Sequence, residues 1–157
     1  MSDCRAWPGP VRAMAKAIAS AVAAASEGTA DAFNDAAAAL RRADAETLGV
    51  LLGEVTRDLL ERSHPDGLDS DDAEAVIDCC AQRFSWFEPF DPDALVLVLT
   101  GALGVLDLDE SPVSAAVLIT HGILLITDRL AVLAIDLSPV LEVALRELRR
   151  AQTVELP

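Results

Sequence analysis

Two long apolar runs lie near the middle of the chain, over residues 94–106 and 113–126, and the acidic segment 107–112 separates them. The few polar side chains of this region recur every seven residues, which places each group on one narrow face of a helix. Almost every other position is apolar, so we predict a helical hairpin over residues 92–135, buried at the centre of the fold. The recurring polar residues are Asp93, Thr100 and Asp107 along the first predicted helix, and Ser114, His121 and Asp128 along the second.

Three proline dipeptides mark expected helix starts in this half of the chain: Asp91-Pro92, Ser111-Pro112 and Ser138-Pro139. The short oxygen-bearing side chain accepts a free backbone N–H, and proline at the first helical position loses no needed donor. The alternative is a β-hairpin over residues 117–137 with a turn at Asp128-Arg129. We favour it less, because this dipeptide is not a preferred tight turn and apolar residues do not alternate with polar ones.

Amphipathic spacing predicts further helices on both sides of the hairpin. Apolar residues between 31 and 61 keep one helical phase, which Asp44 interrupts at a core position. An acid there is best explained as a helix cap, so we predict two helices that meet at Asp44, with one long helix as the alternative. A capping box of Asp71 and Glu74 should start the next helix. The last helix should point Val140, Leu141, Val143, Ala144, Leu145 and Leu148 inward.

These elements predict an all-α, single-domain bundle of about six to seven helices around the buried hairpin. The chain has 157 residues, 52% of them apolar, which is enough for one sizeable core. We expect a loose N-terminal segment over residues 1–10, one helical domain over 11–152 and a tail over 153–157. The apolar runs are too short and too acidic at their flanks for membrane spans, and the start of the chain does not resemble a signal peptide. We therefore expect a cytoplasmic protein without membrane contact.

The acidic residues are concentrated in the middle of the chain, whose formal net charge is −14. Residues 1–43 carry five basic and four acidic groups, residues 44–110 carry three and seventeen, and residues 111–157 carry four and five. Such a field disfavours direct contact with nucleic acid or anionic lipid and favours a basic protein partner. The alternative is a solubilising surface that offsets the apolar composition.

Residues able to carry chemistry show no catalytic or metal-binding spacing. There is no Gly-rich phosphate loop, nucleophile elbow or zinc pattern, and the acidic loop 63–72 lacks the spacing of a calcium-binding EF-hand. We therefore predict no catalytic, cofactor or metal site and regard an enzyme as less favoured than a binding protein. Cys4, Cys79 and Cys80 are expected to be reduced thiols, with Cys80 buried and Cys79 near Arg83.

An aromatic segment over residues 84–90 holds three of the four phenylalanines and one of the two tryptophans. We expect it to close one end of the bundle as an aromatic plug. The alternative is an anchor for a partner, because exposed aromatic clusters mark binding sites. Trp86 is the residue that distinguishes the two, since its helical phase lies off the main apolar stripe.

Two hypotheses of function follow. The leading one is a non-catalytic protein that acts through protein–protein interaction, as a regulatory, antagonist or immunity-type partner of a basic protein. Its candidate partner-binding residues are Asp69, Asp71, Asp72 and Trp86. The alternative is a carrier or sensor of a small apolar ligand, with a pocket between the central helices near Thr100 and His121. Homo-oligomerisation stays open, because helices this apolar can bury a face against a second copy.

Overall fold

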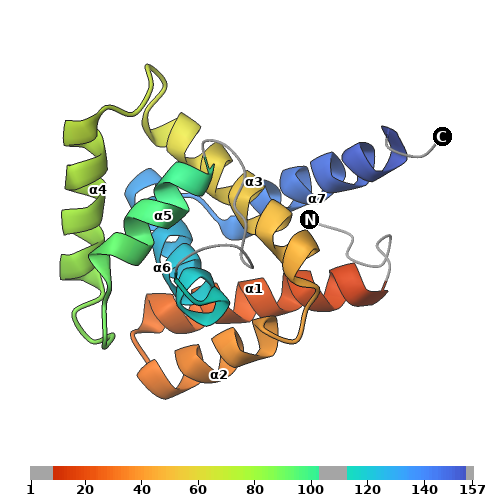
Figure 1. The fold of residues 1–157 in the computed structure, drawn as a ribbon, viewed down its shortest axis with the longest axis horizontal. Coiled ribbons are helices and arrows are strands. Elements are labelled where there is room, and N and C mark those ends of the chain that lie inside the picture. Colours follow the sequence, from red (N-terminus) through yellow and green to blue (C-terminus); the bar gives the residue numbers. More distant parts are fainter. Residues whose placement is uncertain (1–8, 103–112, 155–157) are drawn as a thin grey trace.

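The computed structural model describes residues 9–102 and 113–154, and these form seven α-helices without any strand. The all-α prediction is therefore confirmed, and the β-hairpin alternative over residues 117–137 is wrong. The helices, drawn in Figure 1, are α1 (Gly9–Glu27), α2 (Ala30–Leu40), α3 (Ala45–Ser63), α4 (Ser70–Arg83), α5 (Pro92–Ala102), α6 (Ala115–Leu133) and α7 (Leu137–Val154).

Helix α6 lies at the centre of the bundle. Every residue from 121 to 130 is buried, and α1, α2, α3, α4 and α5 all contact this helix. Its hairpin partner α5 packs along it, as predicted, and α3 covers another side (Figure 1). The link between the two helices, including Asp107, lies outside the described residues. Thus the most apolar helix of the chain lies at the centre of the core, and five other helices pack around it.

The predicted helix starts are confirmed at one of the three prolines. Asp91 caps α5, since its Oδ1 accepts from the backbone N–H groups of Asp93 (3.0 Å) and Ala94 (3.3 Å). The predicted start at Ser111-Pro112 lies outside the described residues, and α6 begins at Ala115, where the Ser114 hydroxyl caps it by accepting from the Val117 N–H. Helix α7 begins at Leu137, which places Pro139 inside the first turn, where its missing N–H removes no intrahelical bond.

Two other predicted helix starts have different outcomes. The break at Asp44 is confirmed, because this residue caps α3 and its Oδ2 accepts from both the backbone N–H and the hydroxyl of Thr47. The capping box of Asp71 and Glu74 is wrong. The pair is Asp69 and Asp72, two residues earlier, and each side chain accepts from the other's backbone N–H (2.8 and 3.1 Å).

The ends of the helical region and the packing face of α7 differ slightly from the prediction. Helix α1 begins at Gly9, two residues before the expected domain start, and α7 continues to Val154, into the segment expected as a tail. On α7, Val143 is 42% exposed rather than buried. It lies off the stripe that packs on the body of the protein, whose buried members are Val140, Leu141, Ala144, Leu145 and Leu148.

Candidate interaction surface on α4

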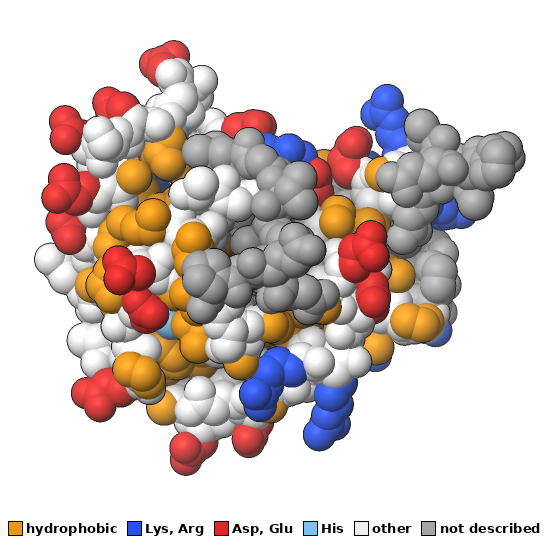
Figure 2. Space-filling model, viewed as in Figure 1, with side chains coloured by type: hydrophobic (Ala, Val, Ile, Leu, Met, Phe, Trp, Pro, Cys, Tyr) orange, Lys and Arg blue, Asp and Glu red, His pale blue; other side chains and the backbone are white. Residues whose placement is uncertain are grey.

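Helix α4 and the loop before it carry a dense cluster of acidic residues. From residue 63 to residue 82 the sequence has six acidic groups and no Lys or Arg. Asp71, Glu74 and Asp78 are exposed, and Asp69 and Asp72 are engaged in the capping box. In the part of the chain that the structure describes, none of the six is in an ion pair. Figure 2 shows acidic side chains along the edge of the molecule where α4 lies.

The same helix is held to the core by few apolar contacts. Val76 and Cys80 are its two fully buried residues among 14, Ala73 and Ile77 are half-buried against the core, and the helix packs beside α5 and α6. Cys80 is buried, as predicted; burial and the nearby Asp128 charge raise the pKa of its thiol, which therefore stays neutral. A helix with so little buried surface needs another attachment.

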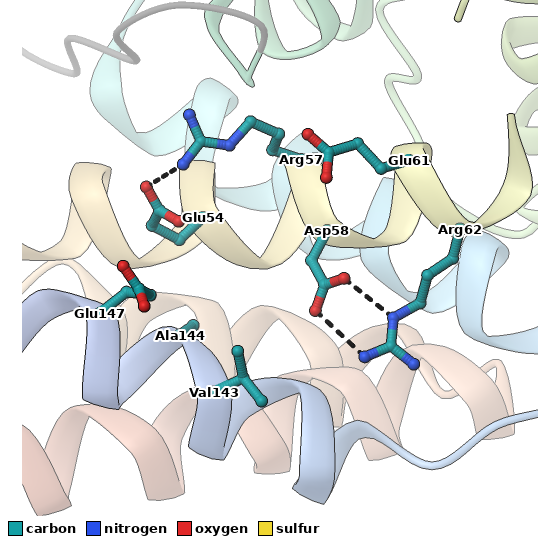
Figure 3. A pocket seen from close by; sticks show the side chains of 8 residues that line it. All are labelled: Glu54, Arg57, Asp58, Glu61, Arg62, Val143, Ala144 and Glu147. Carbon is teal, nitrogen blue, oxygen red and sulfur yellow. Dashed lines mark hydrogen bonds and ion pairs between the residues drawn. The ribbon is translucent and has the colours of Figure 1, made fainter. Parts of the chain in front are cut away.

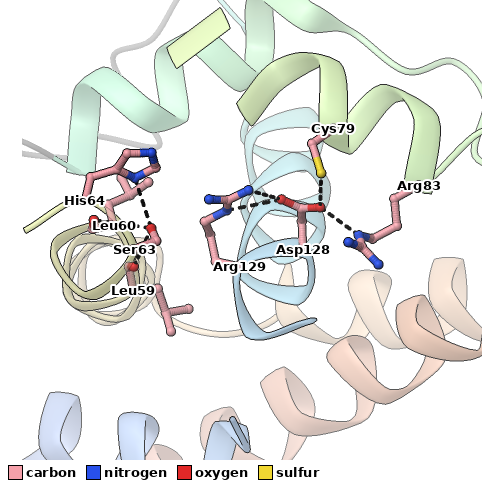
Figure 4. A network of polar contacts seen from close by, with 8 residues as sticks. All are labelled: Leu59, Leu60, Ser63, His64, Cys79, Arg83, Asp128 and Arg129. Atoms are coloured by element: carbon pink, nitrogen blue, oxygen red, sulfur yellow. Dashed lines mark hydrogen bonds and ion pairs between the residues drawn. The ribbon is translucent and has the colours of Figure 1, made fainter. Parts of the chain in front are cut away.

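A fully buried carboxylate on α6 supplies that attachment (Figure 4). Asp128 Oδ1 accepts from Arg83 Nε at 2.7 Å and from Cys79 Sγ at 3.2 Å, and both donors lie on α4. Its other oxygen, Oδ2, accepts from Nε and Nη2 of the buried Arg129 at 3.1 and 2.7 Å. Cys79 lies near Arg83, as expected. Both side chains donate to the same oxygen, Asp128 Oδ1, and so connect α4 to α6.

The charge balance explains why Asp128 remains ionised inside the core. Burial acts to raise the pKa of its carboxyl group, but hydrogen bonds from two guanidinium groups and a thiol outweigh burial and lower this pKa. Without those donors the buried charge would be strongly destabilising, because it would lie in a medium of low dielectric with no counter-ion. The arrangement therefore couples the position of α4 to an intact ion cluster on α6.

An aromatic cluster follows the C-terminal end of α4. Trp86 is half-buried and makes edge-to-face contacts with Phe33, Phe84 and Phe87, with ring centroids 5.7, 6.0 and 6.1 Å apart. Its indole also covers Gly28, where φ is +72° and a Cβ would lie 3.5 Å from the indole nitrogen. These contacts are those of a plug between the α1–α2 turn and the segment after α4.

The candidate partner-binding residues therefore do not form one cluster. Asp69, Asp71 and Asp72 lie at the start of α4, and Trp86 follows its end. A helix of 14 residues is about 21 Å long at 1.5 Å per residue, which is a rough measure of their separation. The acidic residues and the aromatic residue are thus parts of two different surfaces.

The two candidate pocket residues have their polar groups occupied. The exposed Thr100 hydroxyl donates to the Val96 carbonyl of its own helix. His121 is buried, and its Nε2 accepts from the Asp91 N–H at 2.9 Å, which leaves Nδ1 to donate to the Val117 carbonyl at 2.8 Å. Burial lowers the pKa of His121 and keeps the ring neutral. His121 thus offers no free polar group to a ligand in this conformation, and Thr100 offers only the acceptor capacity of its hydroxyl oxygen.

The ion cluster around Asp128 is the main feature that the sequence interpretation missed. The partners of Asp128 on α4, Arg83 and Cys79, lie 45 and 49 residues earlier in the chain, a separation that no local spacing reveals. One signal was present, because adjacent Asp128 and Arg129 interrupt a strongly apolar helix, and charges in such a place are kept only when paired. The described residues include no group of three or more His, Cys, Asp or Glu placed to hold a metal ion.

Helix α6 is long and apolar enough to cross a membrane by length and composition, but 67% of its apolar window is buried inside the protein. That burial is typical of the core helix of a soluble protein. Comparison of the chain with protein-family models, curated proteins and solved structures gives no match.

Proposed function

We propose that the protein acts by non-catalytic binding and presents the acidic face of α4 to a basic protein, as a regulatory, antagonist or immunity-type partner does. The observation that supports this proposal most is the exposure of Asp71, Glu74 and Asp78 on a helix whose only arginine, Arg83, is engaged with Asp128. The face is therefore available to an external cation without first breaking an internal ion pair.

The expected interaction depends on the sum of several weak contacts. A single exposed ion pair contributes about 0–1 kcal/mol, so no one aspartate can account for stable binding. A set of like charges also creates a field that speeds association with a basic surface and weakens when salt screens it. The net charge of −14 adds to that field at long range. Binding should thus be faster and tighter at low salt.

We also propose that the protein works in the cytoplasm. Cys79 and Cys80 are free thiols, which fits a reducing compartment. The other support is the burial of α6, which leaves its apolar window largely inside the protein.

The test is a pull-down from the native cell extract with two charge-reversed variants. Glu74→Lys with Asp78→Lys reverses two exposed acids one turn apart on α4. The matched control, Asp31→Lys with Asp35→Lys, reverses two exposed acids with the same spacing on α2. We expect a basic protein to be captured by the unmodified protein and by the α2 variant at about 0.15 M salt, and to be released at about 0.5 M.

The α4 variant should lose that capture. Equal capture by all three proteins, or capture that ignores salt, would contradict the proposal. Circular dichroism of each variant checks that its helices are intact before the comparison is made.

A further inference from the structure

A groove between α3 and α7, on a different surface from α4, has a composition of its own (Figure 3). Its volume is about 430 Å³, and its walls hold four carboxylates, two arginines and two apolar side chains. Three of the carboxylates, Glu54, Asp58 and Glu61, come from α3, and Glu147 comes from α7. The groove therefore has acidic side chains on both walls.

The ion pairs around this groove do not connect its walls. On α3, Arg57 pairs with Glu54 and Arg62 pairs with Asp58. The pairs described on α7 likewise join residues three or four apart, Glu142 with Arg146 and Glu147 with Arg150. Each described pair thus lies within a single helix, and Glu54 and Glu147 face each other from opposite walls (Figure 3). Each of these two carboxylates has an arginine partner on its own helix, and a cation placed between the walls could bind both carboxylates at once.

Two of the three α3 carboxylates in the groove, Glu54 and Asp58, are more sheltered from water than the exposed acids of α4, whereas Glu61 is exposed. The side chains of Glu54 and Asp58 are 28% and 27% exposed. Because screening is weaker for partly buried charges, a cation that reaches them gains more than it would at a fully exposed aspartate. Surface pairs within one helix contribute only a few tenths of a kcal/mol, so Arg57 and Arg62 can be displaced at low cost.

The α7 wall adds an apolar contact. Val143 lines the groove and is 42% exposed, although the apolar spacing of α7 predicted it inside the core. An occupant that suits both features has an aliphatic side chain to cover Val143 and cationic side chains on either side of it. Such a pattern is that of an amphipathic helix lying between two helices.

We propose that the α3–α7 groove binds an amphipathic helical segment of a basic protein, with a leucine-like residue on Val143 and arginine or lysine side chains between Glu54, Asp58 and Glu147. The inference rests on the proposed function in that the partner is basic, but it assigns the apolar contact to this groove and leaves α4 to long-range attraction.

The test uses a synthetic peptide as the probe. An alanine-based peptide of about 16 residues, long enough to form helix, carries one central leucine and arginines one turn to each side. It is titrated into the ¹⁵N-labelled full chain, and a peptide with glutamate in place of arginine serves as the control. We expect chemical-shift changes centred on residues 54–62 and 143–147 with the arginine peptide only.

Two variants of exposed valines separate the groove from general attraction. Val143→Arg places a cation and extra volume in the groove and should weaken binding about tenfold or more. Val132→Arg makes the same change at a valine that is 50% exposed on α6 and should bind as the unmodified protein does. Equal affinity of the two variants would overturn the inference.

The outcome also distinguishes this inference from the proposed function. Shifts confined to α4, lost in the Glu74→Lys, Asp78→Lys variant, would overturn the groove assignment and leave the acidic face of α4 as the binding surface. If the arginine peptide leaves the resonances of α3 and α7 unmoved, the groove assignment is wrong, whatever the pull-down shows.

Discussion

Helices α6 and α4 place their charged residues in opposite ways. On α6, ten consecutive residues are buried, and the charged Asp128 and Arg129 lie inside the core, where they bind each other. On α4, two residues are buried, and the acids point to solvent. Buried charges require partners, so those of α6 serve architecture, while the acids of α4 remain available to an external partner.

The comparison also shows how a thinly packed helix can be fixed in place. Helix α4 contributes Arg83 and Cys79 to a carboxylate on α6 and so gains polar contacts that its small apolar face cannot supply. Its position therefore depends on the ion cluster around Asp128 as well as on its own apolar packing. Changes at Asp128 should move α4, and changes on the acidic face should leave α6 undisturbed.

The largest expected effect follows from removing the shared carboxylate. Asp128→Ala leaves Arg129 buried without its counter-ion and should lower the free energy of unfolding by about 3–5 kcal/mol. Urea denaturation measures this change. The control is Glu142→Ala, which removes the carboxylate of an exposed pair with Arg146 and should cost less than about 0.5 kcal/mol. Similar costs for the two variants would refute the role given to Asp128.

As the pH falls, protonation of His121 should lower the stability of the protein at a higher pH than protonation of Asp128 does. The folded pKa of His121 lies below its ordinary value of 6.5, so the folded state binds the proton more weakly than the unfolded state. Its contribution to stability is therefore complete above about pH 6.5 and is lost as pH falls toward the lowered pKa. The loss is at most about 1.4 kcal/mol per pH unit.

Denaturation of the unmodified protein and of His121→Gln between pH 7 and pH 5 measures this loss, since the variant should show a flatter profile. Identical slopes would contradict it. The lowered pKa of Asp128 affects stability only below its ordinary value of 3.8, so the two windows are separate.

A smaller effect, a gain in stability, is expected from a substitution at Ala134, the residue that ends α6. Ala134 has φ of +54°, a left-handed conformation that costs a non-glycine residue about 1 kcal/mol, and its N–H donates to the Ala131 carbonyl. Ala134→Gly should therefore raise the free energy of unfolding by up to about 1 kcal/mol. Thermal denaturation would show a higher melting temperature. A lower one would mean that the entropy of glycine in the unfolded chain outweighs the relief of strain.

The smallest effect should come from the acidic face itself. Glu74→Lys with Asp78→Lys changes two exposed, unpaired side chains and should shift the free energy of unfolding by less than about 0.5 kcal/mol. Urea denaturation of this pair beside Asp128→Ala sharpens the contrast between a surface for binding and a charge that holds the fold. A loss of several kcal/mol would place the α4 acids among the structural charges.

Much of the fold was predictable because local rules decide it. The buried hairpin follows from apolar runs with a seven-residue polar repeat, and the break at Asp44 follows from an acid at a core position. Local rules locate the helix starts less accurately, because neighbouring residues compete as caps. Ser114 caps α6 where Ser111 was expected, and Asp69 caps α4 in place of Asp71.

The long-range features were not predictable from spacing. The contact between Cys79 and Asp128 joins residues 49 apart, and which charges meet depends on how the helices cross. The groove was not predictable for the same reason. Val143 lines it only because α7 packs against the protein through its other apolar residues and leaves Val143 beside α3. Local patterns singled out Cys80 and His121 as notable residues of the core helices, but they could not identify the residues that these side chains contact.

Native-state hydrogen exchange tests the central contrast most directly, because it measures the free energy of opening for each helix separately. The amides of α6 should exchange only through global unfolding, and those of α4 through a local opening of lower free energy. Asp128→Asn should lower protection in α4 more than in α1 or α2. Equal opening free energies for α4 and α6, unchanged in α4 by that substitution, would contradict the view that a buried carboxylate on the core helix holds the acidic helix in place.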